Sequence, residues 1–516
     1  MKTRNLFLSL FAFAALCACN KEAQPETPQI LGEDACLSVR IMSADVNTKA
    51  TGDFEVGSGE ENAVTNVLFA FFSADGKFMY AEEVTGFEWD KGEKNPNVED
   101  YSNVKVVLNG TNIAPRQMVV VLNYNNDILT AIKGNGSSIP GIENISQMYN
   151  AVTTNVYSLA SSTNFVMTNS SYANNSGVNM FAAKIDETDI HKADEAATPE
   201  QIVDVYVERV AAKLSVETSG SLVTTSNDLV LHNGNTIKYY PVIQGYAFTG
   251  TKDASYLCKN IQGVYTDFKT PWPEWNDPTN KRSYWGVSSP SAESVYVPYA
   301  NVNKASGHSE YCHENMTEAK TKLMVKAVIR KQEGANQAPA TDPVLSLVKV
   351  GATYYIKDEL EAAIVAELAA AGAYWNDGVD NQNYDKSHID YTPITSGTGY
   401  EVKMVLTKPE ASTDKVASVM DKYANVVLWD EGQCYFSTKV AHLGNDDTDP
   451  ASDYGVVRNH VYKLSVTKIA GLGTPYVPGI GGDGGDPVVP SDIDYELEAR
   501  INILKWKVVE QDVVLQ

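Results

Sequence analysis

The sequence is poor in the residues from which most catalytic and nucleic-acid-binding sites are built. Its 516 residues include six cysteines and seven histidines, and no GxSxG, P-loop or dinucleotide-binding glycine pattern occurs. Lysine and arginine number 41 against 65 aspartates and glutamates, a formal net charge of −24. Neutralising phosphates requires clustered basic residues, so this balance argues against a nucleic-acid partner. We therefore expect no catalytic site, no cofactor and no bound metal.

One group of histidines and cysteine has a spacing that a metal site could use. His308 and His313 flank Cys312, and imidazole and thiolate are zinc ligands. No HExxH helix accompanies them, so a solvated loop is the favoured interpretation. Four cysteines lie beyond the N-terminal segment, and none belongs to a CxxC unit. The sequence leaves open whether disulfides join Cys258, Cys312 and Cys434.

A long apolar run occurs only at the N-terminus. Leu6–Leu16 follows a short basic segment and is shorter than the roughly 20 apolar residues of a membrane-spanning helix. It predicts a signal peptide over residues 1–18. The run ends in Leu16–Cys19, which resembles the lipobox of bacterial lipoproteins. Cys19 is therefore the predicted acylation site, and it would anchor the chain to a membrane.

Short β-type runs separated by polar turns make up most of the remaining chain. Val67–Phe72 leads into Asp75–Gly76, and Val104–Leu108 ends at Asn109–Gly110, both of which are turn dipeptides. Gln117–Leu122 is apolar on both faces, as expected of a central strand. Many short strands with turn signals predict an all-β fold of stacked β-sandwiches. Further runs of this type are Ile202–Val207, Ala212–Val216, Thr236–Tyr240, Leu323–Ile329, Tyr400–Leu406, Val426–Trp429 and His460–Thr467.

One helix interrupts this pattern. Leu360, Ile364 and Leu368 fall on one helical face, and Gly372 ends the run. We interpret the helix as an insertion that covers a sheet.

The chain ends in a β-type segment placed after a linker. Gly471–Pro490 is rich in glycine and proline, a composition typical of flexible linkers. Beyond it, alternation places Leu504, Trp506 and Val508 on one face of a strand. The polar residues Glu510–Asp512 predict a break before a short second strand. The apolar residues of the two predicted strands are Ile501, Ile503, Leu504, Trp506, Val508, Val509, Val513 and Leu515.

A similar strand precedes the first domain. Leu37, Val39 and Ile41 alternate with polar residues, and a polar stretch that ends in Lys49 follows. A basic residue in an exposed loop is accessible to a trypsin-like protease. A cut between Lys49 and Ala50 would remove the first strand together with the lipid anchor.

Loss of that strand would leave unpaired backbone groups at an apolar slot. Such a slot is a template for another strand, and the tail of a neighbouring copy could enter it by β-augmentation. The eight apolar tail residues would then form a donor strand. The alternative is that the tail packs on its own domain as an ordinary last strand.

Several stretches together resemble the fimbrillin family, and in particular the minor-fimbria type of subunit in type V pili. Each stretch is short, but their order and spacing match that family. Residues 250–390 carry no matching motif, and their role stays open. The matching stretches are the lipobox at Cys19, Asn47–Thr51, Val119–Tyr124, Phe165–Thr168, Val207–Lys213, Arg458–Tyr462 and the tail that contains Trp506.

The resemblance implies two tandem transthyretin-like β-sandwich domains with a helical insertion and a C-terminal donor-strand extension. It implies a lipoprotein precursor, palmitoylated at Cys19 and anchored in the outer membrane. A maturation protease would cut at Lys49–Ala50, and copies of the chain and other pilus subunits would join head to tail. The best-known members are cut after arginine, so Arg40 remains an alternative site. The implied divisions are 1–18 signal peptide, 19–49 prosegment, 50–220 first domain, 221–475 second domain, and 476–516 linker and donor strands.

A function of another class also fits the composition. The 28 tyrosines and seven tryptophans could form a glycan-binding face, because aromatic rings stack on sugars. The competing hypothesis is an anchored surface lipoprotein that binds glycans or other nutrients. The sequence leaves open the adhesion ligand, the identity of the protease, and whether the subunit is stalk or accessory.

Overall fold

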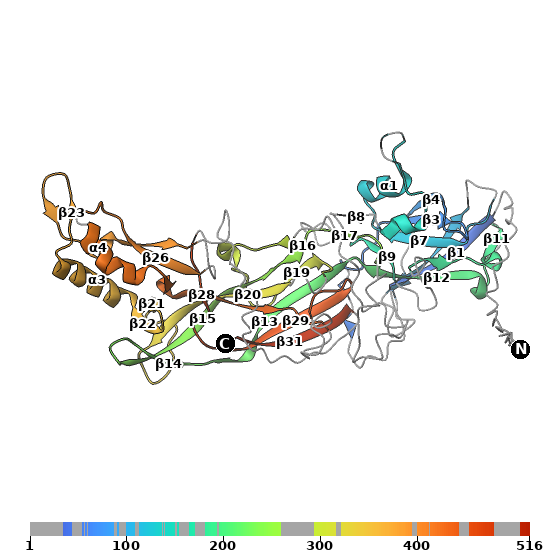
Figure 1. Ribbon diagram of the computed structural model, residues 1–516. Coiled ribbons are helices and arrows are strands. Elements are labelled where there is room, and N and C mark those ends of the chain that lie inside the picture. The colour runs from blue at the N-terminus through green and yellow to red at the C-terminus, as the bar shows by residue number, and fades with distance from the viewer. Residues whose placement is uncertain are drawn as a thin grey trace, which may run out of the picture.

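Three hydrophobic cores follow one another along an elongated molecule (Figure 1). No helix in the part of the chain described here is long and apolar enough to cross a membrane. The computed structural model describes residues 35–43, 54–55, 57–58, 60–86, 90–91, 100–108, 113–136, 138, 140–149, 152–153, 165–170, 181–192, 196–259, 294–315, 321–394, 400–411, 413–442, 454–478 and 506–515.

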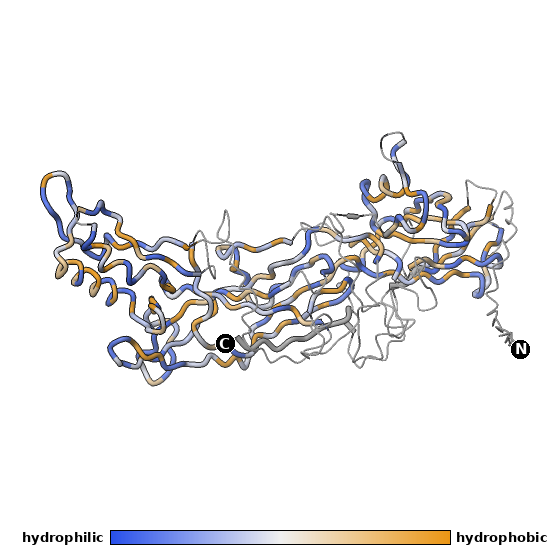
Figure 2. Tube along the Cα trace, in the orientation of Figure 1, coloured by the Kyte–Doolittle hydropathy of each residue, from blue (hydrophilic) through white to orange (hydrophobic). Residues whose placement is uncertain are grey.

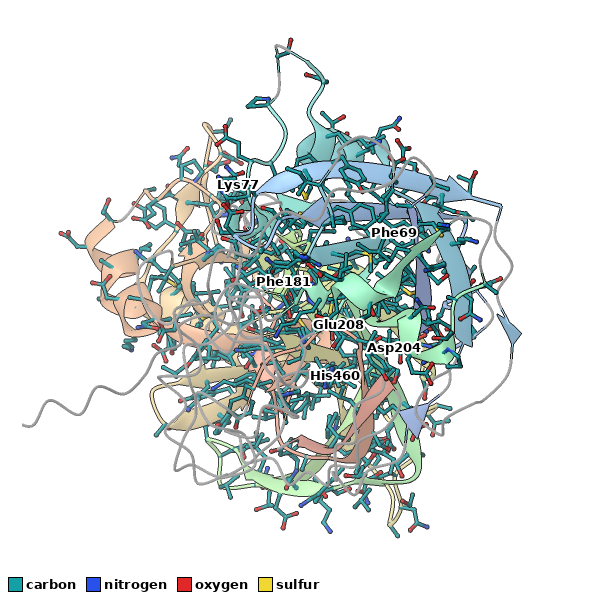
Figure 3. All side chains as sticks on the ribbon, turned by 90° about the vertical axis from the view of Figure 1, so that its right-hand side faces the viewer. Phe69, Lys77, Phe181, Asp204, Glu208 and His460 are labelled. Carbon is teal, nitrogen blue, oxygen red and sulfur yellow. The ribbon has the colours of Figure 1, made fainter. Side chains whose placement is uncertain are left out.

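A ten-stranded sheet surrounds the first core. Its main path is β4-β3-β7-β9-β12-β1-β6-β5, with β10 paired to β7 and β11 paired to β1. Phe69 and Phe181 are fully buried there (Figure 3), and apolar residues run along these strands (Figure 2). The strands are β1 (Ala35–Ser43), β3 (Asn66–Phe72), β4 (Phe78–Thr85), β5 (Asp90–Lys91), β6 (Asp100–Val107), β7 (Gln117–Leu122), β9 (Met167–Asn169), β10 (Ala183–Lys184), β11 (Ile190–Lys192) and β12 (Ile202–Arg209).

Two five-stranded sheets form a sandwich around the second core. Their orders are β19-β13-β29-β31-β2 and β14-β15-β20-β28-β30. Inward-facing residues alternate along the strands, as in the burial of β29. The strands are β2 (Phe54–Glu55), β13 (Ala211–Thr224), β14 (Asn227–Val230), β15 (Thr236–Thr249), β19 (His308–His313), β20 (Lys322–Gln332), β28 (Gln433–Lys439), β29 (His460–Ile469), β30 (Thr474–Pro475) and β31 (Trp506–Leu515).

The third core lies between one more sheet and two helices, at the end of the molecule opposite the first core (Figure 1). The sheet order is β22-β21-β27-β26-β25. Leu360, Ile364 and Leu368 of α3 are buried against it, and Gly372 ends the helix in the left-handed conformation. The elements are β21 (Leu347–Val350), β22 (Thr353–Ile356), α3 (Lys357–Ala371), β25 (Ile389–Pro393), β26 (Glu401–Leu406), α4 (Thr413–Met420) and β27 (Val426–Trp429).

The remaining elements are short. The helix α1 lies at the first core, where Ile128 and Ile132 are buried, and its N-terminus is capped by the Asn125 side chain, which accepts from the Ile128 N–H. Three two-stranded ladders pair β8 with β17, β16 with β18, and β23 with β24. Their bounds are α1 (Asn126–Lys133), β8 (Val152–Thr153), β16 (Thr251–Lys252), β17 (Ser255–Tyr256), β18 (Ser294–Val295), β23 (Trp375–Asn376) and β24 (Asn381–Gln382).

The predicted all-β fold with a helical insertion is confirmed. The change from the first core to the second falls between Ala211 and Ala212 of β13. The predicted domain boundaries at 220 and 475 stay predictions.

Candidate functional site

The strand β1 lies inside the first sheet, with a partner along each edge. Cys36–Met42 pairs antiparallel with β6, and Ser38–Ser43 pairs parallel with β12. β11 also pairs with Ala35–Leu37. Removing β1 would therefore expose unpaired backbone groups on both β6 and β12.

The two faces of β1 have different surroundings. Leu37 and Val39 are fully buried in the first core. On the other face, the Ser38 hydroxyl lies 3.2 Å from Nε2 of His191. The Arg40 guanidinium donates to both carboxylate oxygens of Asp204, at 2.5 and 2.7 Å. The strand is thus held by its backbone, by two apolar side chains and by one bidentate ion pair.

The tail strand β31 pairs within its own molecule, at an edge of the second sandwich. It runs parallel to β29, with Lys507 opposite His460 and Leu515 opposite Ile469. Among the strands that the structure describes, its other edge pairs with β2, where Phe54 faces Lys507 and Glu55 faces Trp506. In Figure 1, β31 lies beside β29 near the middle of the molecule, and β1 lies at the end that carries the N-terminus.

The tail forms one strand, and the predicted break at Glu510–Asp512 is wrong. These three residues pair with Lys463–Ser465 of β29. Backbone hydrogen bonds do not depend on side-chain type, so polar residues can continue an edge strand.

Some of the predicted site residues lie in the part of the chain that the structure describes, and the others lie outside it. Ile41 lies in β1 by its backbone, and five of the donor residues lie in β31. Lipidation and cleavage sites, and the first donor residues, lie outside the described residues. The five in β31 are Trp506, Val508, Val509, Val513 and Leu515, and those outside are Cys19, Lys49, Ala50, Ile501, Ile503 and Leu504.

β1 and β31 belong to different sheets, but their pairing is similar. Each has an antiparallel neighbour on one edge, β6 or β2, and a parallel neighbour on the other, β12 or β29; β1 also pairs with β11 at Ala35–Leu37. The two strands contain 9 and 10 residues respectively. The difference lies in extent. β1 has partners along both edges for most of its length, whereas β31 has an extended partner along one edge only.

Two buried ion pairs lie at the junction between the first core and the second. Lys259 and Glu208 are fully buried and 3.2 Å apart. Arg458 donates to Glu314 and, at 2.8 Å each, to the carbonyl oxygens of Tyr256 and Leu257. Each ion thus has a buried partner of opposite charge, which limits the cost of removing it from water.

Burial shifts the pKa values of ionisable groups at this junction. Burial lowers the pKa of the Lys259 amine, and the neighbouring Glu208 and Glu314 carboxylates oppose that shift. Burial also lowers the pKa of His313 to about 4. These groups are therefore surrounded by protein rather than by water, and we interpret them as parts of the domain junction.

Sequence patterns missed this junction. The predicted runs Ile202–Val207 and Ala212–Val216 leave Glu208 and Arg209 between them, but β12 extends through Arg209 and β13 begins at Ala211. Arg209 is buried because its guanidinium donates to the Glu61 carbonyl oxygen and to Oδ1 of Asn459, both at 3.1 Å. The available signal was the position of two charges inside the apolar run of Val207–Lys213.

The histidine and cysteine group does not form a metal site. His308, Cys312 and His313 lie on β19, where alternation directs Cys312 and His313 to opposite faces. The interpretation as a solvated loop is wrong, because Cys312 and His313 are buried. Within the described ranges, no group of three or more His, Cys, Asp or Glu side chains is arranged to hold a metal. Cys258, Cys312 and Cys434 are buried thiols, not disulfides.

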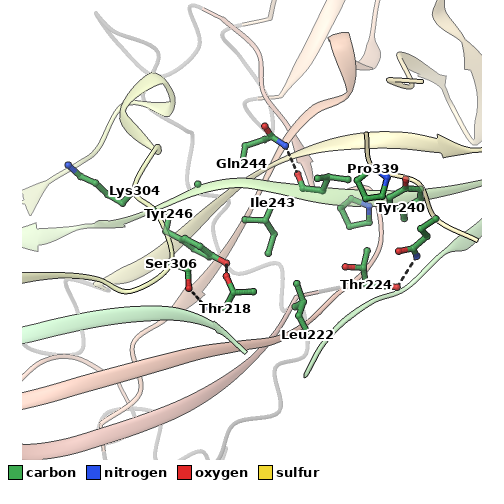
Figure 4. Close-up of a pocket in the computed structure, with 15 residues that line it drawn as sticks. Thr218, Leu222, Thr224, Tyr240, Ile243, Gln244, Tyr246, Lys304, Ser306 and Pro339 are labelled. Atoms are coloured by element: carbon green, nitrogen blue, oxygen red, sulfur yellow. Dashed lines mark hydrogen bonds between the residues drawn. The ribbon is translucent and has the colours of Figure 1, made fainter. Parts of the chain in front are cut away.

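A cavity of about 380 Å³ lies between β13 and β15 (Figure 4). Several of its polar side chains are bonded to neighbouring protein groups. The Tyr246 hydroxyl lies 2.6 Å from Oγ1 of Thr218, and the Gln244 amide donates to the Val242 carbonyl oxygen at 3.2 Å. These bonds leave no convergent set of groups of the kind that defines a small-molecule site.

Residues 428–512 match the family model described as major fimbrial subunit protein type IV, fimbrillin, C-terminal. The C-terminal region of the chain thus matches the fimbrillin family. The matched region contains β28, β29, β30 and most of β31. The match supports a fimbrial subunit, and hence a cell-surface location and assembly with other subunits.

Solved structures of fimbrial proteins are similar to part of this chain. A fimbrial assembly protein from Parabacteroides distasonis is 14% identical, with 60% of this chain and 86% of that chain covered, at a TM-score of 0.31. The tip fimbrial protein Mfa3 from Porphyromonas gingivalis is 11% identical, with 58% and 84% covered, at a TM-score of 0.26. No curated protein matches the chain. The likeness to fimbrillins therefore rests on residues 428–512.

Proposed function

We propose that this protein is a fimbrial stalk subunit that polymerises by strand exchange after proteolytic maturation. The precursor is palmitoylated at Cys19 and anchored in the outer membrane. A trypsin-like protease cuts between Lys49 and Ala50, and β1 leaves the first sheet. The β31 strand of a neighbouring subunit then enters the empty slot.

One observation carries the proposal: β31 already pairs in the pattern that the slot requires. The slot offers β12 as a parallel partner and β6 as an antiparallel partner. In its own molecule β31 has one extended partner, β29, whereas in the slot it would have two, β12 and β6. Backbone pairing along both edges supplies affinity in β-augmentation.

Two kinds of energetic term stabilise a strand in the slot. Each fully buried side chain at the positions of Leu37 and Val39 contributes about 1.5–3 kcal/mol. With ladder hydrogen bonds of about 1 kcal/mol each, a strand of this length supplies on the order of 10 kcal/mol before ordering costs. The contact joins different surfaces of two copies, so it propagates into a filament instead of closing a dimer.

The position of Arg40 supports Lys49 as the cleavage site. Arg40 pairs on one side with Asn103 and on the other with Asp204, and its side chain is bound to Asp204. A protease needs an extended, unpaired segment, so a cut after Arg40 requires β1 to leave the sheet first. Lys49 lies beyond the end of β1 at Ser43.

The test is N-terminal sequencing and gel analysis of fimbriae sheared from cells. We expect mature subunits that begin at Ala50 and form ladders. A chain that ends at Pro490 should be exported and cut normally but should not form ladders. Equal ladders from that chain, or mature subunits that retain Cys19, would refute strand exchange.

A second function, glycan binding, is favoured by one observation. A cavity of about 630 Å³ lies between the second and third cores, and its lining includes Tyr239, Tyr354, Tyr400 and Trp429. Aromatic rings stack on the apolar faces of sugars. Binding of neutral oligosaccharides on an array, lost in Tyr400→Ala, would support it. An anchored, monomeric mature protein with such binding would favour this function over the stalk role.

A further inference from the structure

The short strand β2 links the maturation site to the donor strand. In the sheet order β2 lies at the outer edge, next to β31, through Phe54 opposite Lys507 and Glu55 opposite Trp506. The predicted cut at Lys49–Ala50 lies between β1 and β2 in the chain. The segment that contains the predicted cut therefore connects β1, which fills the slot, to β2, which pairs with the tail strand β31.

The pairing of β2 is weak by itself. It has 2 residues, and a ladder hydrogen bond contributes only about 0.5–1.5 kcal/mol net. So short a strand stays in place because the chain is held on both sides. On one side is β1, paired along the first sheet, and on the other is β3. Cutting the chain on the β1 side leaves β2 near a free end, where backbone pairing frays.

We propose that β2 is a clasp on the donor strand and that the maturation cut opens it. One proteolytic event thus empties the acceptor slot and frees the second edge of the donor strand, which is then held by β29. In the uncut precursor both ends of the subunit stay closed, which prevents assembly before the anchor is removed. The inference rests on the proposed strand exchange and adds its regulation.

Hydrogen exchange of the full chain tests the clasp. The amides of Trp506–Leu515 are followed by mass spectrometry in dilute monomer, before and after cutting with trypsin. We expect the cut to accelerate exchange at Trp506 and Lys507, which face β2, by about tenfold or more, the effect of losing one or two ladder hydrogen bonds. Unchanged exchange in the cut monomer would overturn the clasp.

A pair of uncut variants isolates the clasp from the slot. Phe54→Pro/Glu55→Pro removes both backbone N–H groups of β2 but leaves β1 attached. It should accelerate exchange of the tail as the cut does, without assembly. Phe54→Ala/Glu55→Ala keeps both N–H groups and should leave the tail protected. Equal protection in the two variants, or equal release, would show that the β2 backbone does not hold the tail.

The readouts separate this inference from the proposed function. Tail exchange is measured in monomers, whereas strand exchange is measured by the assembly of chains with and without the tail. If the cut leaves tail exchange unchanged but assembly still requires the tail, strand exchange stands and the clasp is wrong. If the cut accelerates tail exchange but chains without the tail assemble equally well, the proposed function is wrong and the clasp is still supported.

Discussion

Retention of β1 in the first sheet should control how fast subunits assemble. Leu37 is fully buried in the first core, and truncating a buried leucine to alanine costs about 2–5 kcal/mol. A loss of about 3 kcal/mol weakens the hold on a cut β1 segment by on the order of 100-fold, since 1.4 kcal/mol is tenfold. We therefore expect cut Leu37→Ala subunits to release the segment and assemble much faster than the parent chain.

The assay follows release and assembly after trypsin cutting at low protein concentration. Size-exclusion chromatography with mass spectrometry measures the freed N-terminal segment, and gel ladders measure assembly. Leu68→Ala is the matched control. Leu68 is equally buried in the first core, but it lies on β3, which β7, β9 and β12 separate from β1 in the sheet. It should lower the stability of the uncut chain similarly without accelerating release. Equal release from the two variants would refute the argument.

Three further predictions concern the junction and the cut. The folded chain leaves His313 unprotonated until about pH 4, whereas the unfolded chain protonates it near pH 6.5. The free energy of unfolding should therefore fall by about 3 kcal/mol as the pH drops from about 6.5 to 4. His313→Gln should flatten this pH dependence when unfolding by urea is measured at each pH. An unchanged pH dependence in that variant would contradict the prediction. Arg458→Met leaves Glu314 buried without its main partner and should cost about 3–5 kcal/mol in urea unfolding, which Arg458→Met/Glu314→Leu should partly restore. Limited trypsin digestion of the native precursor should cut after Lys49 before it cuts after Arg40, as mass spectrometry of early fragments would reveal; the opposite order would contradict a strand held by Asp204.

Local patterns predicted much of this fold because their causes are local. The apolar runs at Val67–Phe72 and Gln117–Leu122 became buried strands, and the helix that ends at Gly372 formed where its periodicity placed it. Alternation also identified Leu37 and Val39 as inward-facing, because a strand directs successive side chains to opposite faces.

The candidate site was less accessible to such patterns. Glu208 and Arg209 fell between two predicted strands, yet they lie in β12 and are buried, where partners from distant parts of the chain bind them. The polar residues Glu510–Asp512 read as a break, yet they continue β31 because backbone pairing is indifferent to side chains. Both errors arise from partners that are remote in the sequence.

The sequence by itself determined the strand-rich composition, the strand faces and the inserted helix, since each follows from the residues in one short segment. Only the tertiary structure decided that β1 lies between β6 and β12, that β31 lies between β29 and β2, and that the junction charges are buried. Every strand offers the same backbone donors and acceptors. The choice of partner therefore depends on how distant segments pack around a shared core.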